Sequence, residues 1–118
     1  MNRHERRKQK KNNKFNTLNN NRLIEGIKHH TQRNFSKAQE IYNFVLSKEP
    51  NNYEAIRHLG ILYYDTMRKE EAYNSFQAAI KLYPERCEAF NNLGFIHLEN
   101  MNYKLAEKCF KESIKKKE

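Results

Sequence analysis

The chain has 118 residues, of which 37% are apolar and 31% are charged, and its formal net charge is +9. This length suits one domain, and the small number of glycines and prolines favours an all-α fold. No apolar run approaches the ~20 residues that span a bilayer, and no apolar signal segment follows the positive N-terminus. Two cysteines in a chain without such a signal indicate reduced thiols, so we predict a cytoplasmic location.

Residues 1–18 are rich in Arg, Lys and Asn and have almost no side chain to bury. The first fourteen residues carry seven basic side chains and one acidic side chain, Glu5, so most of the net charge lies there. We predict a disordered or frayed tail, with a helix over 3–11 as the alternative. Its candidates for phosphate contact on RNA, DNA or anionic lipid are Arg3, Arg6, Arg7, Lys8, Lys10, Lys11 and Lys14. No aromatic residue precedes Phe15, so such contact would be nonspecific, and a purely solubilising extension is the other interpretation.

Beyond the tail, apolar residues recur with the period of amphipathic helices. The predicted helices span about 20–31, 36–48, 52–66, 69–82, 86–99 and 103–117. The asparagines at 19–21 and 51–52 are natural N-caps for the first and third of these helices. Pro50 and Pro84 end the second and fourth.

One pattern occurs three times at intervals of 34 residues. The repeated sets are Gly26, Gly60 and Gly94; Ala38, Ala72 and Ala106; and Tyr42, Phe76 and Phe110. A fixed period of this length indicates one supersecondary unit used repeatedly, here over about 19–52, 53–86 and 87–118. The small residues let antiparallel helices approach closely, and the aromatic residue fills the space beside them.

The middle unit carries the residues that identify the repeat. They are Leu59, Gly60, Tyr63, Ala72, Phe76, Ala79 and Pro84. This pattern resembles the tetratricopeptide repeat, and the resemblance extends over about residues 19–118. It implies an all-α solenoid of three stacked helix-turn-helix units, in which the first helix of each unit lines a concave groove for a partner peptide. It also implies a protein–protein interaction adaptor or scaffold that is not an enzyme and needs no cofactor.

The two ends of the predicted stack differ in polarity. The first unit has polar residues where the others have apolar ones, as expected for a helix with no unit stacked before it: Arg22, Glu25, Lys28 and His29. The third unit is not followed by the solvating helix that family members usually have. Three alternatives remain open: the charged residues of 104–117 solvate that side, the chain self-associates there, or a longer protein continues.

The family pattern places a mixture of apolar and polar side chains in the groove. From the first unit we expect Leu23, Ile24, Ile27 and Thr31; from the second, Glu54, Arg57, His58, Ile61, Tyr64 and Asp65; from the third, Glu88, Asn91, Asn92, Phe95, Leu98 and Glu99. Such a surface suits a peptide with one or two apolar anchors. The alternative for Ile27, Ile61 and Phe95 is packing between neighbouring helices.

Some family members bind acidic C-terminal peptides through a clamp of Lys or Arg and Asn side chains. Arg57 and Asn92 stand where two clamp members could fall. Leu23 and Ile27 stand where the first unit should supply Lys and Asn, and Glu88 places a negative charge where a Lys is needed. Because like charges oppose each other, the sequence disfavours this clamp.

No constellation of residues indicates catalysis or a metal centre. The candidate histidines lie on different predicted helices, and we interpret His97 as a packing residue. Cys87 and Cys109 are 22 residues apart without a second pair, so neither a zinc site nor a redox motif is expected.

Two alternative functions follow from the same residues. In the first, the basic arm dominates and the protein is a nucleic-acid- or ribosome-associated factor. In the second, the chain is the N-terminal segment of a larger transferase, because family members often precede such domains.

Overall fold

The computed structural model describes residues 2–117, and over 8–16 it describes the backbone alone. This part of the chain forms six helices and no strands: α1 (Arg3–Thr31), α2 (Phe35–Lys48), α3 (Tyr53–Asp65), α4 (Lys69–Leu82), α5 (Glu88–Glu99) and α6 (Tyr103–Lys117). The predicted all-α fold is confirmed, and every predicted helix boundary but the first lies within two residues of its observed position.

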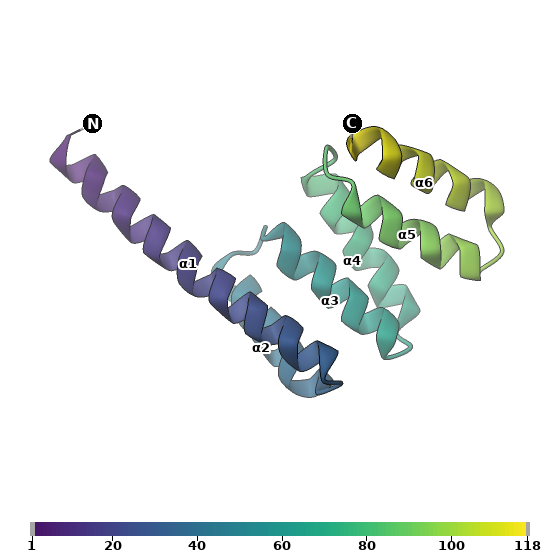
Figure 1. The fold of residues 1–118 in the computed structure, drawn as a ribbon, viewed down its shortest axis with the longest axis horizontal. Coiled ribbons are helices and arrows are strands. Elements are labelled where there is room, and N and C mark those ends of the chain that lie inside the picture. Colours follow the sequence, from purple (N-terminus) through teal and green to yellow (C-terminus); the bar gives the residue numbers. More distant parts are fainter. Residues whose placement is uncertain (1, 118) are drawn as a thin grey trace.

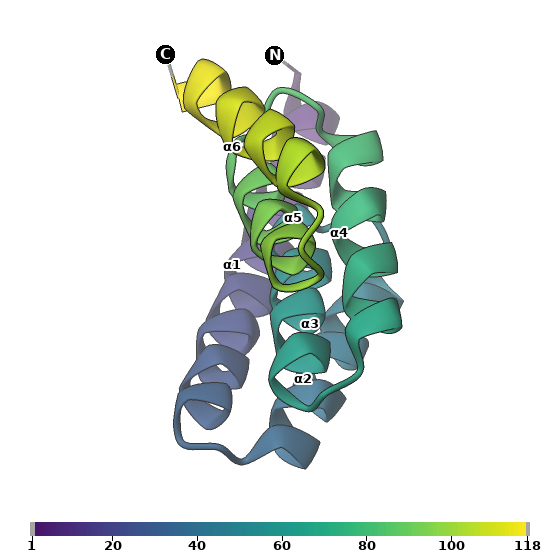
Figure 2. The ribbon, with the colours of Figure 1, turned by 90° about the vertical axis from the view of Figure 1, so that its right-hand side faces the viewer.

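The helices are arranged as three consecutive hairpins (Figure 1). The most extensive contacts join α1 to α2, α3 to α4 and α5 to α6, and smaller ones join α2 to α3 and α4 to α5. In Figure 2, α3 lies between α1 on one side and α4 on the other. Each hairpin therefore leans on the next, which gives an elongated solenoid of 56 × 34 × 18 Å.

Close helix crossings inside each hairpin require glycine on the first helix. A Cβ atom added to Gly60 would lie 2.8 Å from Cε1 of Phe76, and one added to Gly94 would lie 2.6 Å from Cε1 of Phe110. Gly26 and Tyr42 stand in the same relation, also at 2.8 Å. The 34-residue spacing of these pairs thus reflects the same steric contact made three times.

The turn inside each hairpin also repeats. Arg33, Met67 and Met101 follow α1, α3 and α5 with φ values of 63°, 67° and 62°, in the left-handed region. The amide of the next residue bonds back to the preceding helix, as Arg68 N does to the Tyr63 carbonyl at 2.7 Å. This is a Schellman-type ending with a side chain where glycine is usually favoured.

Helix α1 begins at Arg3, so the predicted start at about residue 20 is wrong. Asn2 caps it: its side chain accepts a hydrogen bond from the Glu5 amide at 2.8 Å, while Glu5 Oε2 accepts one from the Asn2 amide at 3.2 Å. Arg, Lys and Gln are good helix formers, so the helix continues upstream of the asparagines. Asn19, one of the expected caps, instead lies fully buried within α1.

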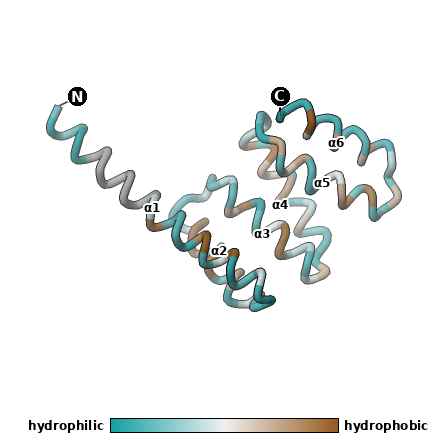
Figure 3. Tube along the Cα trace, in the orientation of Figure 1, coloured by the Kyte–Doolittle hydropathy of each residue, from teal (hydrophilic) through white to brown (hydrophobic). Residues whose placement is uncertain are grey.

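The first part of α1 projects beyond the hairpins (Figure 1). Residues 3–7, at its start, are hydrophilic (Figure 3). The division of the chain at residue 18 into a basic tail and a repeat domain stays a prediction. The cap expected at the third helix is confirmed at Asn52, whose Oδ1 accepts a hydrogen bond from the Ala55 amide at 3.0 Å.

Candidate peptide-binding groove

The first helices of the three hairpins share a hollowed face. A hollow of about 380 Å³ lies between α3 and α5, and a second of about 380 Å³ lies between α1 and α3. Both include Ile61 and Asp65 of α3. The two hollows therefore adjoin, and we name their combined surface the groove.

The hollow between α3 and α5 has an apolar floor. Its apolar side chains come from both walls and from the helix beneath: Ile61, Phe76, Phe95 and Leu98. Phe95 is 50% exposed and Leu98 43% exposed, whereas Phe76 is buried and fixes the base. The edge ring contact of Phe95 with Phe110, 5.2 Å between centroids, holds Phe95 in place. Polar side chains form the rim: Tyr64, Asp65, Asn92 and Glu99.

The hollow between α1 and α3 is more polar. His30 lies between Tyr42 and Asp65: Nδ1 is 3.3 Å from Tyr42 Oη, and Nε2 is 2.7 Å from Asp65 Oδ2. The ring of His30 also makes an edge contact with Phe35, with 5.7 Å between the ring centroids. His30 thus ties the first hairpin to the second and supports this part of the groove.

A ladder of polar contacts joins successive first helices. His30 pairs with Asp65, and Tyr64 donates a hydrogen bond to Glu99, which is the equivalent pair one repeat later. Both pairs are separated by 35 residues, one more than the repeat period. Each first helix is therefore offset from the next by about one residue, so a side chain meets the successor of its own counterpart.

Two further rungs of the ladder lie nearer the start of α3. Tyr53 donates a hydrogen bond to Glu88 Oε2 at 3.1 Å, and Arg57 Nη1 donates one to Asn92 Oδ1 at 3.3 Å. Burial raises the pKa of Tyr53 to about 12. Tyr53 therefore remains a neutral donor at physiological pH.

Glu54 is the most strongly perturbed carboxylate of the described residues. It contacts His58 Nε2 at 3.5 Å, Arg57 Nη2 at 3.1 Å and Arg86 Nη2 at 3.1 Å. The hydrogen bond from His58, followed by the charge of Arg57, lowers the pKa of Glu54 to about 2 against the opposing effect of burial. The acidic and basic side chains at this end of the groove thus neutralise each other.

The structure places the predicted groove residues in three surroundings. Residues that line the two hollows are Ile27, Thr31, His58, Ile61, Tyr64, Asp65, Asn92, Phe95, Leu98 and Glu99. Glu54, Arg57 and Glu88 belong to the polar contacts near the start of α3 and α5. Ile24 and Asn91 are exposed and line neither hollow. The role of these residues in binding stays a prediction.

Two corrections concern α1. Leu23, expected in the groove, is 7% exposed and packs with Ala38, Tyr42 and Leu59 in the core. His30 was not among the expected groove residues, although it stands 34 residues before Tyr64 and could have been found by counting from it.

The alternative for Ile27, Ile61 and Phe95 is packing between neighbouring helices, and two of the three show such packing. Ile27 and Ile61 are half-buried and pack against the core clusters while also lining the hollows. Phe95 is the most open of the three.

The two suspected clamp residues bind each other. Arg57 also donates a hydrogen bond to Glu54 Oε2 at 3.1 Å, and its side chain is only 16% exposed. The charge of Arg57 is therefore already paired with a carboxylate, which disfavours a second carboxylate from a ligand.

The described basic residues of the predicted tail lie on the projecting part of α1. Arg3, Arg6 and Arg7 are exposed. The side chains of Lys8, Lys10, Lys11 and Lys14 lie outside the described part of the chain.

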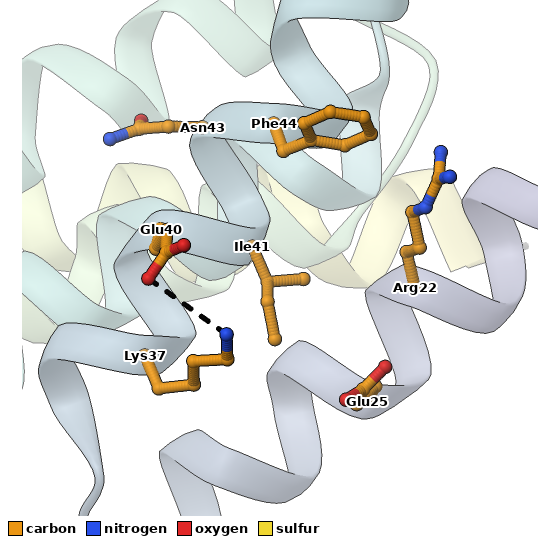
Figure 4. A pocket seen from close by; sticks show the side chains of 7 residues that line it. All are labelled: Arg22, Glu25, Lys37, Glu40, Ile41, Asn43 and Phe44. Atoms are coloured by element: carbon orange, nitrogen blue, oxygen red, sulfur yellow. Dashed lines mark ion pairs between the residues drawn. The ribbon is translucent and has the colours of Figure 1, made fainter.

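A hollow of about 510 Å³ between α1 and α2 lies apart from the groove (Figure 4). It contains Arg22 and Glu25, the polar counterparts of Ile56 and Leu59 in the next repeat. The Arg22 guanidinium lies 4.5 Å from the centre of the Phe44 ring, and Lys37 pairs with Glu40 at 3.9 Å. Arg22 thus contacts α2, whereas Lys37 and Glu40 pair within α2 and Glu25 pairs with His29 of α1 at 3.9 Å.

His97 is buried and packs edge-on against Tyr73 at 5.8 Å, in agreement with the predicted packing role. Both cysteines are free thiols. Among the side chains that the structure describes, those of residues 2–7 and 17–117, no cluster of three or more metal-ligating groups occurs. Across that same range, the helices are too short or too polar to cross a membrane.

Residues 53–86 and 88–115 match the family model described as Tetratricopeptide repeat. The chain therefore belongs to the tetratricopeptide repeat family, and the predicted resemblance is confirmed. A search of curated proteins found no match.

Solved structures of repeat proteins have the same fold. The Sgt2 TPR domain from Aspergillus fumigatus superposes with a TM-score of 0.77 at 22% identity, over 85% of this chain and 66% of that one. MamA gives 0.75 at 17% identity, over 84% of this chain and 58% of that one. The second TPR of Spaghetti (RPAP3), bound to the HSP90 peptide SRMEEVD, gives 0.73 at 18% identity, over 81% and 89%.

The chain thus spans less than two thirds of the MamA chain it matches. At these identities the likeness establishes the fold. This fold supports a protein–protein interaction module, and tetratricopeptide repeats are typically non-catalytic interaction modules.

Proposed function

We propose that this chain is a non-catalytic adaptor that binds a short segment of a partner protein in the groove. The observation that carries the proposal is the continuity of the two hollows through Ile61 and Asp65. A surface that runs across α1, α3 and α5 suits an extended chain segment better than a compact small molecule.

The exposed apolar side chains indicate where the segment would be anchored. Phe95 and Leu98 leave about half of their surface in water beside a buried floor. An apolar side chain that enters this hollow would cover them, while the polar rim would bond the backbone of the segment. Because only a few anchors are available, we expect affinities in the micromolar range, about −8 kcal/mol.

The peptide bound to the RPAP3 repeat is acidic near its end, with the sequence SRMEEVD. In this chain Arg57 is engaged by Glu54 and Asn92, and Glu88 adds a carboxylate to the same region. We therefore expect this chain to bind segments of a different composition, and we expect SRMEEVD to bind poorly.

Two half-exposed leucines provide a matched test of the groove. Leu98 lies in the hollow between α3 and α5, and Leu82 is 40% exposed at the end of α4. Peptides selected from a random display library on the full chain would be measured by fluorescence anisotropy. We expect Leu98→Ser to weaken binding by about tenfold and Leu82→Ser to leave it unchanged. Equal effects of the two variants would exclude the groove as the binding site.

The projecting basic arm favours a second candidate function, contact with a polyanion such as RNA, DNA or anionic lipid. Arg3, Arg6 and Arg7 are exposed on a part of α1 that extends away from the hairpins (Figure 1). Binding of this kind should fall steeply between about 50 and 200 mM salt and should weaken when these arginines are changed to Gln. Polyanion binding that changes neither with salt nor with these substitutions would exclude the arm as the binding site.

We also propose, on the sequence grounds given above, that the protein is a cytoplasmic scaffold. Self-association with a second copy through α6 belongs to the same proposal, because Leu105 and Ile114 are 49% and 61% exposed there. Sedimentation over a concentration series should show a dimer that Ile114→Lys dissociates. A monomer at every concentration would refute this interface.

A further inference from the structure

We propose that the hollow between α3 and α5 selects a partner segment in which the apolar anchor is accompanied by a lysine or arginine. This inference rests on the proposed function and specifies the chemistry of the partner. It follows from the charge, position and bonding of two carboxylates, Asp65 and Glu99.

Charge complementarity is the first argument. Of the eight side chains that line the hollow, two are carboxylates and none is basic. The side chains of Asp65 and Glu99 are 42% and 45% exposed, so a ligand can reach both. The protein carries an overall charge of +9, yet this hollow presents negative charge beside an apolar floor.

The C-terminal ends of α3 and α5 add to the negative potential in the hollow. Asp65 is the last residue of α3 and Glu99 is the last residue of α5. The carbonyl ends of two helices therefore lie close to the two carboxylates, and a helix C-terminus carries a partial negative charge. A cation from the partner would interact favourably with all four groups.

Neighbouring groups occupy only part of the Asp65 and Glu99 carboxylates. His30 contacts Asp65 through Oδ2, and no other contact of the Asp65 carboxylate is found within the described part of the chain. Glu99 accepts the Tyr64 hydroxyl hydrogen bond and pairs with Lys69 at 3.4 Å in an exposed position. Exposed ion pairs contribute little and exchange readily, so Lys69 can give way to a cation of the ligand.

The opposite end of the hollow does not attract a cation. There Asn92 meets Arg57, whose charge is balanced by Glu54. The hollow therefore has one neutral end and one acidic end, and a bound segment should place its cation toward Asp65 and Glu99.

Spacing along α3 defines how far the cation lies from the anchor. Ile61 and Asp65 are four residues apart on a helix, about 6 Å. An extended chain covers this distance in two residues, about 6.6 Å, with both side chains on the same face. The expected motif is thus an apolar residue and a lysine or arginine two positions away.

A peptide array probed with the full chain tests this motif. Each spot would present an extended decapeptide of Gly and Ser with one Leu, and with Lys, Gln or Glu at a spacing of one to four residues. The probes would be the wild type, the neutral double variant Asp65→Asn with Glu99→Gln, the control Glu107→Gln with Glu112→Gln on α6, and Leu98→Ser. Each double variant removes two negative charges from the protein. A difference in retention between them therefore reports the loss of charge in the hollow and not a change in the overall attraction of peptides to the basic arm.

We expect the wild type and the control to retain the Leu–Lys spots about two- to fivefold better than the Leu–Gln spots, most strongly at a spacing of two. The Asp65→Asn, Glu99→Gln variant should lose this preference. Equal retention of Lys, Gln and Glu spots that still depends on Leu98 would overturn the cation preference and leave the proposed function standing. Failure to retain any spot would count against both.

Discussion

Gly60 lies where α3 crosses α4 so closely that a Cβ atom would stand 2.8 Å from the Phe76 ring. We expect Gly60→Ala to destabilise the fold by about 1–3 kcal/mol, because the buried ring has little room to move. Urea denaturation would measure the change. Phe76→Leu in the same chain should recover part of the loss.

Asn74→Ala on the exposed side of α4 is the control for this crossing. It should change the free energy of unfolding by no more than about 0.5 kcal/mol. Similar shifts for Gly60→Ala and Asn74→Ala would mean that the crossing is not tight.

Glu54 links stability to pH. Its pKa is about 2 in the folded chain against an ordinary value of 4.5, chiefly through the hydrogen bond from His58. A depressed pKa contributes stability that is present above the unfolded value and is lost as the pH falls toward about 2. We expect the unfolding free energy of Glu54→Gln to fall less steeply than that of the wild type between about pH 5 and pH 2.

Denaturant titrations at a series of pH values would show this difference, with Glu70→Gln on the exposed face of α4 as a control that keeps the wild-type slope. If Glu54→Gln and the wild type have the same slope, the contacts around Glu54 do not stabilise the fold.

At the scale of the elements, the turn after α3 shows a local conflict between sequence and conformation. Met67 has a φ of 67° and is 76% exposed, so its side chain contributes little packing in return for the strained backbone. We expect Met67→Gly to raise the free energy of unfolding by about 0.5–1 kcal/mol. Urea midpoints would measure the gain.

Met67→Ala separates the backbone effect from side-chain loss, because it shortens the side chain without making a positive φ easier. It should leave the urea midpoint nearly unchanged. A midpoint that drops for Met67→Gly as it would in a helix interior would contradict the assigned turn.

The helices themselves could be predicted well from the sequence, and α1 shows where this prediction failed. The apolar period and Asn52 located α3 to within one residue, because the pattern and the cap agree there. In α1 the apolar period begins only near Leu23, and the upstream turns contain only two apolar residues, Phe15 and Leu18, too few to mark a helix. Helix propensity and the capping pair of Asn2 and Glu5 were the signals that the periodicity did not contain.

At the scale of the whole molecule, the 34-residue period predicted the stack and most of the groove. It did not predict the ladder, because side chains meet with a separation of 35 residues that depends on how adjacent helices are offset. The hydrogen bond from Arg57 to Asn92 has the same origin, because these two residues also stand 35 apart. A repeat period in the sequence does not determine which side chains of adjacent repeats contact each other.

Methyl NMR of the full chain, titrated with a peptide that the groove retains, tests most directly whether the first helices bind the partner. The isoleucines are natural reporters: Ile27 and Ile61 line the groove, whereas Ile41 faces the hollow between α1 and α2 and Ile114 is exposed on α6. We predict that the Ile61 methyl signal shifts most, with Ile27 next and the other two unchanged. Shifts at Ile41 or Ile114 with Ile61 unmoved would contradict binding in the groove.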